Sequence, residues 1–215
     1  MIVDIVAAMA RGRLITVEGL DGAGKTTQAR GLAGELEARG VPVRLLREPG
    51  GVEVSERVRE LVQDPAHAVA PRAEALLYAA ARAQLVEELL APLLEAGTWV
   101  VLDRFVDSSL AYQGGGRGLG VDAVRAINDF ATGGLTPDRT VLLRVDLVTG
   151  RARQADRGAA PDRLEREDGA FFDAVARVYE ELAAAEPDRI RVVDAERAPD
   201  EVLADVVAAV EDLLP

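Results

Sequence analysis

The stretch GLDGAGKT, residues 19–26, satisfies the pattern G-x-x-x-x-G-K-[ST]. The apolar run LITVE at residues 14–18 precedes it, and a helical pattern over residues 25–39 follows it. In this context of strand, loop and helix, glycines bring backbone N–H groups toward phosphate oxygens, and the helix points its positive end at the same anion. The stretch therefore predicts a P-loop for a nucleoside triphosphate. The residues expected to bind ATP are Gly19, Leu20, Asp21, Gly22, Ala23, Gly24, Lys25, Thr26 and Thr27.

Lys25 is the only lysine in a chain with 25 Lys and Arg residues. Arginine serves where a surface charge is all that is needed, so the retained lysine favours a position where a guanidinium does not fit. A lysine here reaches the β- and γ-phosphates as a compact point charge, which makes Lys25 a catalytic candidate. Thr26 offers a hydroxyl to Mg²⁺, and Asp103 ends the apolar run WVVLD. An aspartate often ends a strand by chance, but beside this loop it favours a second Mg²⁺ ligand.

Strand and helix patterns alternate along the rest of the chain. Further strands are expected at residues 41–46, 98–103, 140–145 and 190–193, and further helices at 53–63, 72–95, 121–131, 168–185 and 199–213. This alternation predicts an α/β fold of the P-loop NTPase type, a five-stranded parallel sheet with helices on both faces. We expect a flexible extension at residues 1–10, one domain over 11–215, and a short lid at about 150–166. GGGRGLG at 114–120 is interpreted as a turn and RGAAPDR at 157–163 as a mobile basic loop.

Composition excludes several classes of function. The net charge of -12 and the pI near 4.6 argue against a nucleic-acid partner, because phosphate backbones require a basic face. The absence of cysteine removes disulfides and thiolate metal sites and fits a reducing cytosol. The apolar residues 1–10 carry an aspartate and are too short to span a bilayer, so no membrane partner is expected.

Two features of the sequence favour a small-molecule kinase over a GTPase switch: the absence of a guanine-binding motif and arginines at the ends of predicted strands. An N-K-x-D guanine-reading motif is impossible, because the one lysine belongs to the loop. Arg47 and Arg104 directly follow the second and third predicted strands, and Arg153, Arg157 and Arg163 lie in the predicted lid. Each alone is more simply a solvated surface residue, but together they favour a second anion site and a kinase for a small phosphorylated acceptor.

Several segments together resemble the bacterial thymidylate kinase family, ATP-dependent kinases that convert dTMP to dTDP. The segments are ITVEGLDGAGKTTQ at 15–28, REPGG at 47–51, LLYAAARAQLVEE at 76–88, GTWVVLDRF at 97–105 and SLAYQGGGRG at 109–118. They follow the family's order from about residue 11 onward. The resemblance implies a cytoplasmic, Mg²⁺-dependent enzyme that is usually a homodimer.

The resemblance also implies roles for individual residues. Tyr78 matches the aromatic residue that stacks on thymine, and Arg82, one helical turn later, matches an arginine that hydrogen-bonds the base. Arg104 matches the arginine that grips the acceptor phosphate. Asp21 matches the carboxylate that reads the 3′-hydroxyl, and Tyr112 matches the tyrosine that favours deoxyribose.

Other matches concern the edges of the site. Ser108 and Gln113 lie where the family contacts or lines the base pocket, Arg47 completes the substrate-binding set, and residues 194–199, DAERAP, resemble the loop beside adenine. Some family members carry an arginine in the P-loop where this chain has Gly22, so the catalytic charge is expected from the lid arginines Arg153, Arg157 and Arg163. Two alternatives remain: a kinase for another nucleoside monophosphate, and a nucleotide-dependent regulatory protein without turnover.

Overall fold

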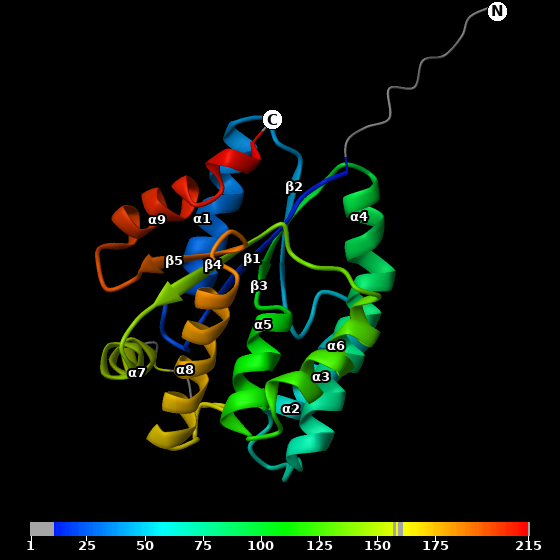
Figure 1. Ribbon diagram of the computed structural model, residues 1–215, viewed down its shortest axis with the longest axis vertical. Helices are drawn as coiled ribbons and strands as arrows, with labels where there is room; N and C mark the ends of the chain where they lie inside the picture. The colour runs from blue at the N-terminus through cyan, green and yellow to red at the C-terminus, as the bar shows by residue number, and fades with distance from the viewer. Residues whose placement is uncertain (1–10, 157, 159–160, 215) are drawn as a thin grey trace, which may run out of the picture.

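The computed structural model describes residues 11–156, 158 and 161–214, and the predicted extension at residues 1–10 lies outside the described residues. The strands are β1 (Leu14–Gly19), β2 (Val43–Arg47), β3 (Trp99–Asp103), β4 (Arg139–Arg144) and β5 (Ile190–Asp194). They form one five-stranded parallel sheet in the order β2-β3-β1-β4-β5 (Figure 1). The sheet confirms the fold class predicted from the alternation of strands and helices.

Helices cover both faces of this sheet. They are α1 (Lys25–Ala38), α2 (Glu53–Gln63), α3 (Pro71–Leu85), α4 (Ala91–Glu95), α5 (Val106–Ser109), α6 (Val121–Thr132), α7 (Leu147–Asp156), α8 (Gly169–Ala185) and α9 (Pro199–Ala208). Two π-helical segments, η1 (Val86–Leu90) and η2 (Leu110–Gly116), and the 3-10 turn η3 (Glu211–Leu213) complete the set. Helices α1 and α9 pack together on one face, while α4, α5 and α8 lie on the other (Figure 1).

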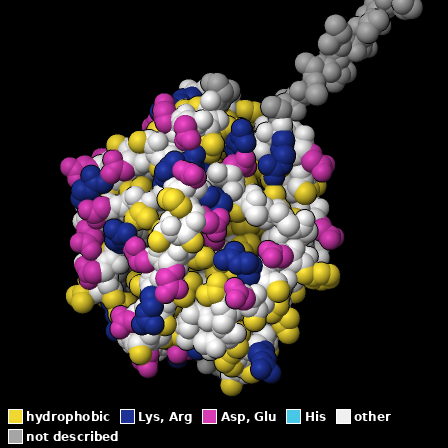
Figure 2. Space-filling view, viewed as in Figure 1, with side chains coloured by type: hydrophobic (Ala, Val, Ile, Leu, Met, Phe, Trp, Pro, Cys, Tyr) yellow, Lys and Arg dark blue, Asp and Glu magenta, His cyan; other side chains and the backbone are white. Residues whose placement is uncertain are grey.

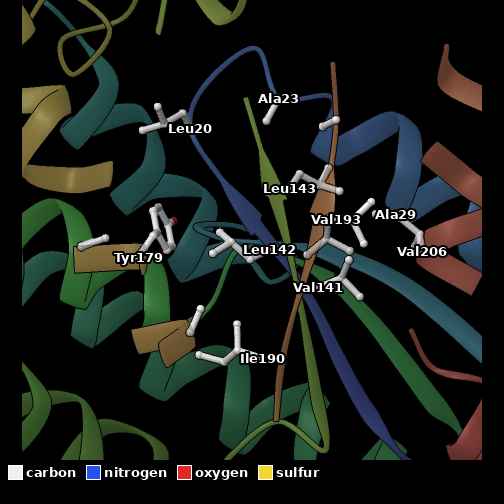
Figure 3. Close-up of a cluster of buried hydrophobic side chains, with 14 of the residues drawn as sticks. Leu20, Ala23, Ala29, Val141, Leu142, Leu143, Tyr179, Ile190, Val193 and Val206 are labelled. Carbon is white, nitrogen blue, oxygen red and sulfur yellow. The ribbon is translucent and has the colours of Figure 1, made fainter. Parts of the chain in front are cut away.

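The core is built from strand residues that alternate between the two faces. In Figure 3, Leu143 and Val193 lie on the side of the sheet where Ala29 of α1 is placed, whereas Leu142 points toward Tyr179 of α8. All five side chains are buried. Because both faces are covered, the strands contain the nearly continuous apolar runs typical of a parallel sheet.

Two segments differ from the sequence predictions. The glycine run at 114–120 was predicted as a turn, but α5 continues through η2 as far as Gly116. A Cβ atom on Gly115 would lie 2.6 Å from Cγ2 of Val178, and one on Gly116 would lie 2.5 Å from Cε2 of Phe171. These glycines therefore allow η2 to pack closely against α8. Helix α7, which was not predicted, extends into the segment expected to be the lid.

The surface is mixed in charge. Basic and acidic side chains are interspersed over the face drawn in Figure 2, rather than separated into a basic stripe. None of the described helices has both the length and the apolar character needed to cross a membrane.

Candidate active site

A cavity of about 740 Å³ lies at the carboxyl ends of β1 and β3, where ligands of parallel α/β sheets bind. The predicted site residues that line it are Asp21, Gly22, Ala23, Gly24, Lys25, Thr26, Thr27, Arg47, Tyr78, Arg82, Asp103, Arg104, Ser108, Tyr112, Gln113 and Arg153. Gly19, Leu20 and Arg163 are outside this lining, and Arg157 lies outside the described residues. Residues separated by more than 100 positions in the chain thus meet at one edge of the sheet.

The predicted P-loop connects β1 to α1. Gly22 and Gly24 have φ angles of 83° and 89°, a region that favours glycine. Gly22 is also held in close contact, because a Cβ atom there would lie 2.1 Å from the carbonyl oxygen of Gly150 in α7. A larger residue at position 22 would collide with this backbone. The packing of α7 therefore gives a physical reason for glycine where some family members carry arginine.

Lys25 and Thr26 begin α1 and reach toward different groups. Nζ of Lys25 donates to the carbonyl oxygen of Leu20 at 2.8 Å and lies 3.6 Å from Oδ1 of Asp21. Burial and the nearby Arg104 lower the pKa of Lys25 to about 8, against the opposing effect of the neighbouring carboxylates. The ammonium thus lies over the loop as a buried cation.

Thr26 and Asp103 form an oxygen pair at the base of the loop. Oγ1 of Thr26 donates to Oδ2 of Asp103 at 2.6 Å. A hydroxyl and a carboxylate are ligands that suit Mg²⁺, so this pair fits the metal role expected of it. Among the described residues, no group of three or more His, Cys, Asp or Glu side chains could hold a metal by itself. Any Mg²⁺ here would accordingly depend on phosphate oxygens and water for its other ligands.

Arg104 joins the P-loop to the rest of the cavity. Its Nη2 contacts Oδ1 of Asp21 and donates to the Tyr112 hydroxyl at 3.2 Å, and that hydroxyl donates to Oδ2 of Asp21 at 2.9 Å. Burial opposes the charge on Arg104, but Asp21 outweighs it and raises the pKa of the guanidinium. Burial likewise opposes the charge on Asp21, yet Arg104 and Lys25 lower the pKa of this carboxyl. Asp21, Arg104 and Tyr112 thus form one charged cluster on the wall of the cavity.

Arg104 has a left-handed backbone with a φ of 70°, which is unusual for a residue with a side chain. The backbone after it is held by Glu18, which accepts hydrogen bonds from the Phe105 amide at 2.7 Å and from the Ser108 hydroxyl at 2.5 Å. The hydroxyl of Tyr179 also donates to Glu18, at 2.9 Å. Burial, with Asp107 nearby, raises the pKa of Glu18 to about 7. Glu18 was not among the predicted site residues, although a carboxylate near the end of a buried strand is a signal of such a role.

Helix α3 supplies the predicted base-binding residues. Tyr78 lines the cavity, and burial, together with nearby acidic groups, raises its pKa. Arg82 is fully buried and donates to Oε2 of Glu48 at 2.8 Å, to Oγ of Ser109 at 2.9 Å and to the Phe105 carbonyl oxygen at 2.9 Å. It therefore ties α3 to neighbouring segments in addition to lining the cavity. The predicted contacts of Tyr78 and Arg82 with a base stay predictions.

The comparisons with known proteins agree with this geometry. A family model described as thymidylate kinase matches residues 17–206. The chain belongs to the thymidylate kinase family. It is 52% identical over 204 residues to the thymidylate kinase of Deinococcus radiodurans, covering 95% of this chain and 98% of that one. The corresponding enzyme of Rhizorhabdus wittichii is 49% identical over 206 residues, covering 95% and 99%. Membership confirms the predicted function, the phosphorylation of dTMP to dTDP.

The predicted lid arginines have different partners. Arg153 of α7 lines the cavity and donates to the Ala195 carbonyl oxygen at 2.8 Å, in the segment resembling an adenine loop. Arg163 instead donates to the Val62 carbonyl oxygen at 2.8 Å and lies 2.6 Å from Oε2 of Glu74. Arg153 thus lies beside the cavity, whereas Arg163 joins the end of the predicted lid to α2 and α3.

Two arginines of the β2–α2 region also line the cavity. Arg47 forms a pair with Glu56, its Nη2 donating to both carboxylate oxygens at 3.0 Å. Arg59 donates to the Pro49 carbonyl oxygen at 3.0 Å, and burial and Arg47 lower its pKa. Arg59 was not among the predicted site residues, because nothing in the sequence shows which side of an amphipathic helix faces a cavity.

Proposed function

We propose that this chain transfers the γ-phosphoryl group of ATP to dTMP within the cavity, with the P-loop holding the donor and Arg104 holding the acceptor phosphate. The observation that carries the proposal is the position of Asp21. Its carboxylate contacts Arg104 and lies 3.6 Å from Nζ of Lys25, so the donor loop and the predicted acceptor site share one wall. The two phosphates would meet between the two cations.

Positioning and charge neutralisation supply the catalysis in this proposal. The phosphate of a nucleoside monophosphate is largely ionised near neutral pH, so no strong general base is required. Lys25 and Arg104 would balance the charge that spreads over the transferred group. Arg153 is the described lid arginine that lines the cavity, which favours it over Arg163 as a further cation. Closure of the lid at about 150–166 would exclude water from the reaction.

The Thr26 and Asp103 pair would hold Mg²⁺. When bound there, the ion would supply positive charge to the phosphate oxygens of ATP. The 2.6 Å bond between Thr26 and Asp103 supports this role, since it brings both oxygen ligands together beside Lys25.

The two bases would contact different elements of the cavity wall. Ala195, Arg197 and Pro199, on the loop after β5, line the cavity and would suit the adenine of ATP, as the resemblance of residues 194–199 implies. Tyr78 of α3 and Gln113 of η2 also line it and would suit the thymine of dTMP. Substrate selection would then depend on α3 and η2, and donor selection on the loop after β5.

We further propose that the protein works as a homodimer in the cytoplasm. Helices α2, α3 and α6 pack side by side (Figure 1). They expose Phe130 at 92% and Leu76 at 56%, with Val54 and Leu61 on α2 also exposed. An exposed phenylalanine is costly in water, and a second copy of this face would cover it.

The proposal is tested by measuring ADP release from ATP and Mg²⁺ with dTMP, dUMP, dCMP, dGMP, AMP, CMP, UMP or no acceptor. Strong dependence on dTMP is expected. Dependence on a different monophosphate would contradict the base-pocket assignment while leaving the kinase intact. Hydrolysis that ignores the acceptor, or none, would favour a regulatory protein without transfer.

A further inference from the structure

We propose that Glu74 is a positioning residue for substrate choice, which orients the Gln113 amide so that the cavity accepts bases that carry an N3–H group and rejects cytosine. Glu74 lies one helical turn before Tyr78 on the same face of α3. Its side chain is fully buried, although carboxylates are rarely buried without a specific set of partners.

The partners of Glu74 hold its carboxylate in one orientation. Nε2 of Gln113 donates to Oε1 at 2.9 Å, and Nε of Arg117 donates to both oxygens at 3.2 Å. Nη2 of Arg163 lies 2.6 Å from Oε2. Arg117 is itself fixed by a 2.6 Å bond to Glu167 and by the Phe171 ring, 4.9 Å away. Contacts from η2, the turn after it and the predicted lid thus prevent rotation of the carboxylate.

This orientation determines which end of the Gln113 amide faces the cavity. A carboxylate paired with guanidinium groups accepts hydrogen bonds but donates none, so the Gln113 nitrogen, and not the oxygen, must face Glu74. Within the described part of the chain no group donates to Oε1 of Gln113, and Gln113 lines the cavity. The carbonyl oxygen is consequently the amide atom that meets a ligand.

A fixed acceptor distinguishes pyrimidine bases by the atom at position 3. Thymine and uracil carry N3–H, which donates to Oε1, whereas cytosine presents a lone pair at N3. Cytosine would lose the hydrogen bond and place two acceptors together in a buried site, a mismatch that a polar pocket rejects strongly. If the amide could rotate, its nitrogen would face the base and the preference would reverse. Glu74 prevents that rotation.

This inference rests on the proposed contact of Gln113 with the base. The test compares wild type with Glu74→Gln and Glu74→Asp, each alone and combined with Gln113→Ala. Dissociation constants are measured for dTMP, dUMP and dCMP, the last by competition against dTMP. Glu74→Gln allows either amide orientation, and Glu74→Asp keeps the charge beside Arg117 and Arg163 but shortens the reach to Gln113. Thermal denaturation establishes that each variant is folded.

Both Glu74 variants should lower the preference for dTMP over dCMP by roughly tenfold or more. The preference for dTMP over dUMP should stay constant, because both bases carry N3–H. In the Gln113→Ala background, changing Glu74 should have no further effect on the ratio of the dissociation constants for dCMP and dTMP. Arg139→Gln is the control for lost stability: it removes a buried arginine that pairs with Asp212 at the start of β4, away from Gln113, so stability should fall without a change in the preference for dTMP over dCMP.

The outcomes separate the two proposals. If Gln113→Ala lowers the ratio while folded Glu74 variants keep the wild-type value, the role of Glu74 is overturned and the contact of Gln113 stands. If Gln113→Ala leaves the ratio unchanged, both are overturned. If Glu74 had a purely structural role, its substitution would weaken the binding of dTMP, dUMP and dCMP by the same factor. That result would also contradict the inference.

Discussion

Lys25 is the single lysine of a chain whose other basic residues are arginines, and its position in the structure explains why lysine is needed there. In a chain that uses arginine elsewhere, the ammonium lies over the P-loop with its Nζ 2.8 Å from the Leu20 carbonyl oxygen. The Lys25 side chain is buried, so a guanidinium with its larger planar group would have to displace the loop or the Arg104 and Asp21 pair. The position thus requires both the charge and the compact shape of lysine.

Replacement of Lys25 by arginine should therefore lower kcat/KM for ATP by roughly 100-fold or more, because the charge no longer fits beside the phosphates. ADP release with dTMP measures the effect, and circular dichroism establishes folding. Arg30→Lys, on the exposed surface of the same helix, is the control and should keep full activity. Full activity in folded Lys25→Arg would contradict the geometric argument for lysine.

Glu18 makes stability depend on pH. The pKa of Glu18 in the folded protein is raised from 4.5 to about 7. As the pH rises, the unfolded chain therefore releases this proton at a lower pH than the folded protein does. The stabilising contribution is complete below pH 4.5 and is lost as the pH rises through 7. The loss amounts to about 3 kcal/mol.

Glu18→Gln should remove this part of the pH dependence. Urea denaturation of both proteins at several values between pH 5 and pH 8 measures the free energy of unfolding. The stability of wild type relative to the variant should fall across this interval. Parallel curves would show that Glu18 does not titrate there, whatever the offset between the two proteins.

At the scale of elements, the contact between η2 and α8 positions the predicted acceptor site. Tyr112 and Gln113 belong to η2, and Phe171 of α8 packs edge-on against Tyr112 with ring centroids 6.1 Å apart. Close packing is possible because Gly115 and Gly116 lack side chains. A glycine run that resembles a turn in sequence thus supports a helical segment in the fold.

Gly116→Ala should destabilise the protein by about 1–3 kcal/mol, since its Cβ would lie 2.5 Å from Cε2 of Phe171. Gly34→Ala in α1 is the matched control, because a Cβ there meets no atom within 4 Å. That exchange should stabilise the helix by about 0.5–1 kcal/mol. Urea denaturation measures both, and equal effects of the two substitutions would contradict the packing argument.

At the scale of the whole molecule, the exposed apolar face of α2, α3 and α6 leads to a prediction about assembly. Phe130→Glu should convert a dimer to a monomer, because the charge would be buried in the interface without a partner. Sedimentation velocity measures the mass. Val148→Glu, on α7 and away from this face in Figure 1, should leave the mass unchanged. A wild-type monomer, or a dimeric Phe130→Glu protein, would contradict the proposed interface.

Only some of the residues of the site can be predicted from the sequence. Lys25, Thr26 and Asp103 follow from local pattern, because a P-loop and a strand end place them at one edge of a parallel sheet. Glu74 could not be found in this way, and local pattern marks Glu18 only as a carboxylate near the end of a strand. The partners of Glu18 include Tyr179, which is 161 positions away in the chain. Arg163 and Arg153 look alike in the sequence, but one pairs with Glu74 and the other lies beside the Ala195 carbonyl.

The P-loop, the alternation of strands and helices and the family resemblance can be predicted from the order of amino acids alone, because they depend on residues that are close together in the chain. The strand order, the helical course of residues 114–116 and the partners of the buried carboxylates became known from the folded structure. Burial and charge pairing depend on distance in space, which the order of residues does not give. The carboxylate of Glu74 on α3 has its hydrogen-bond and charge partners only because η2 and the predicted lid pack against it.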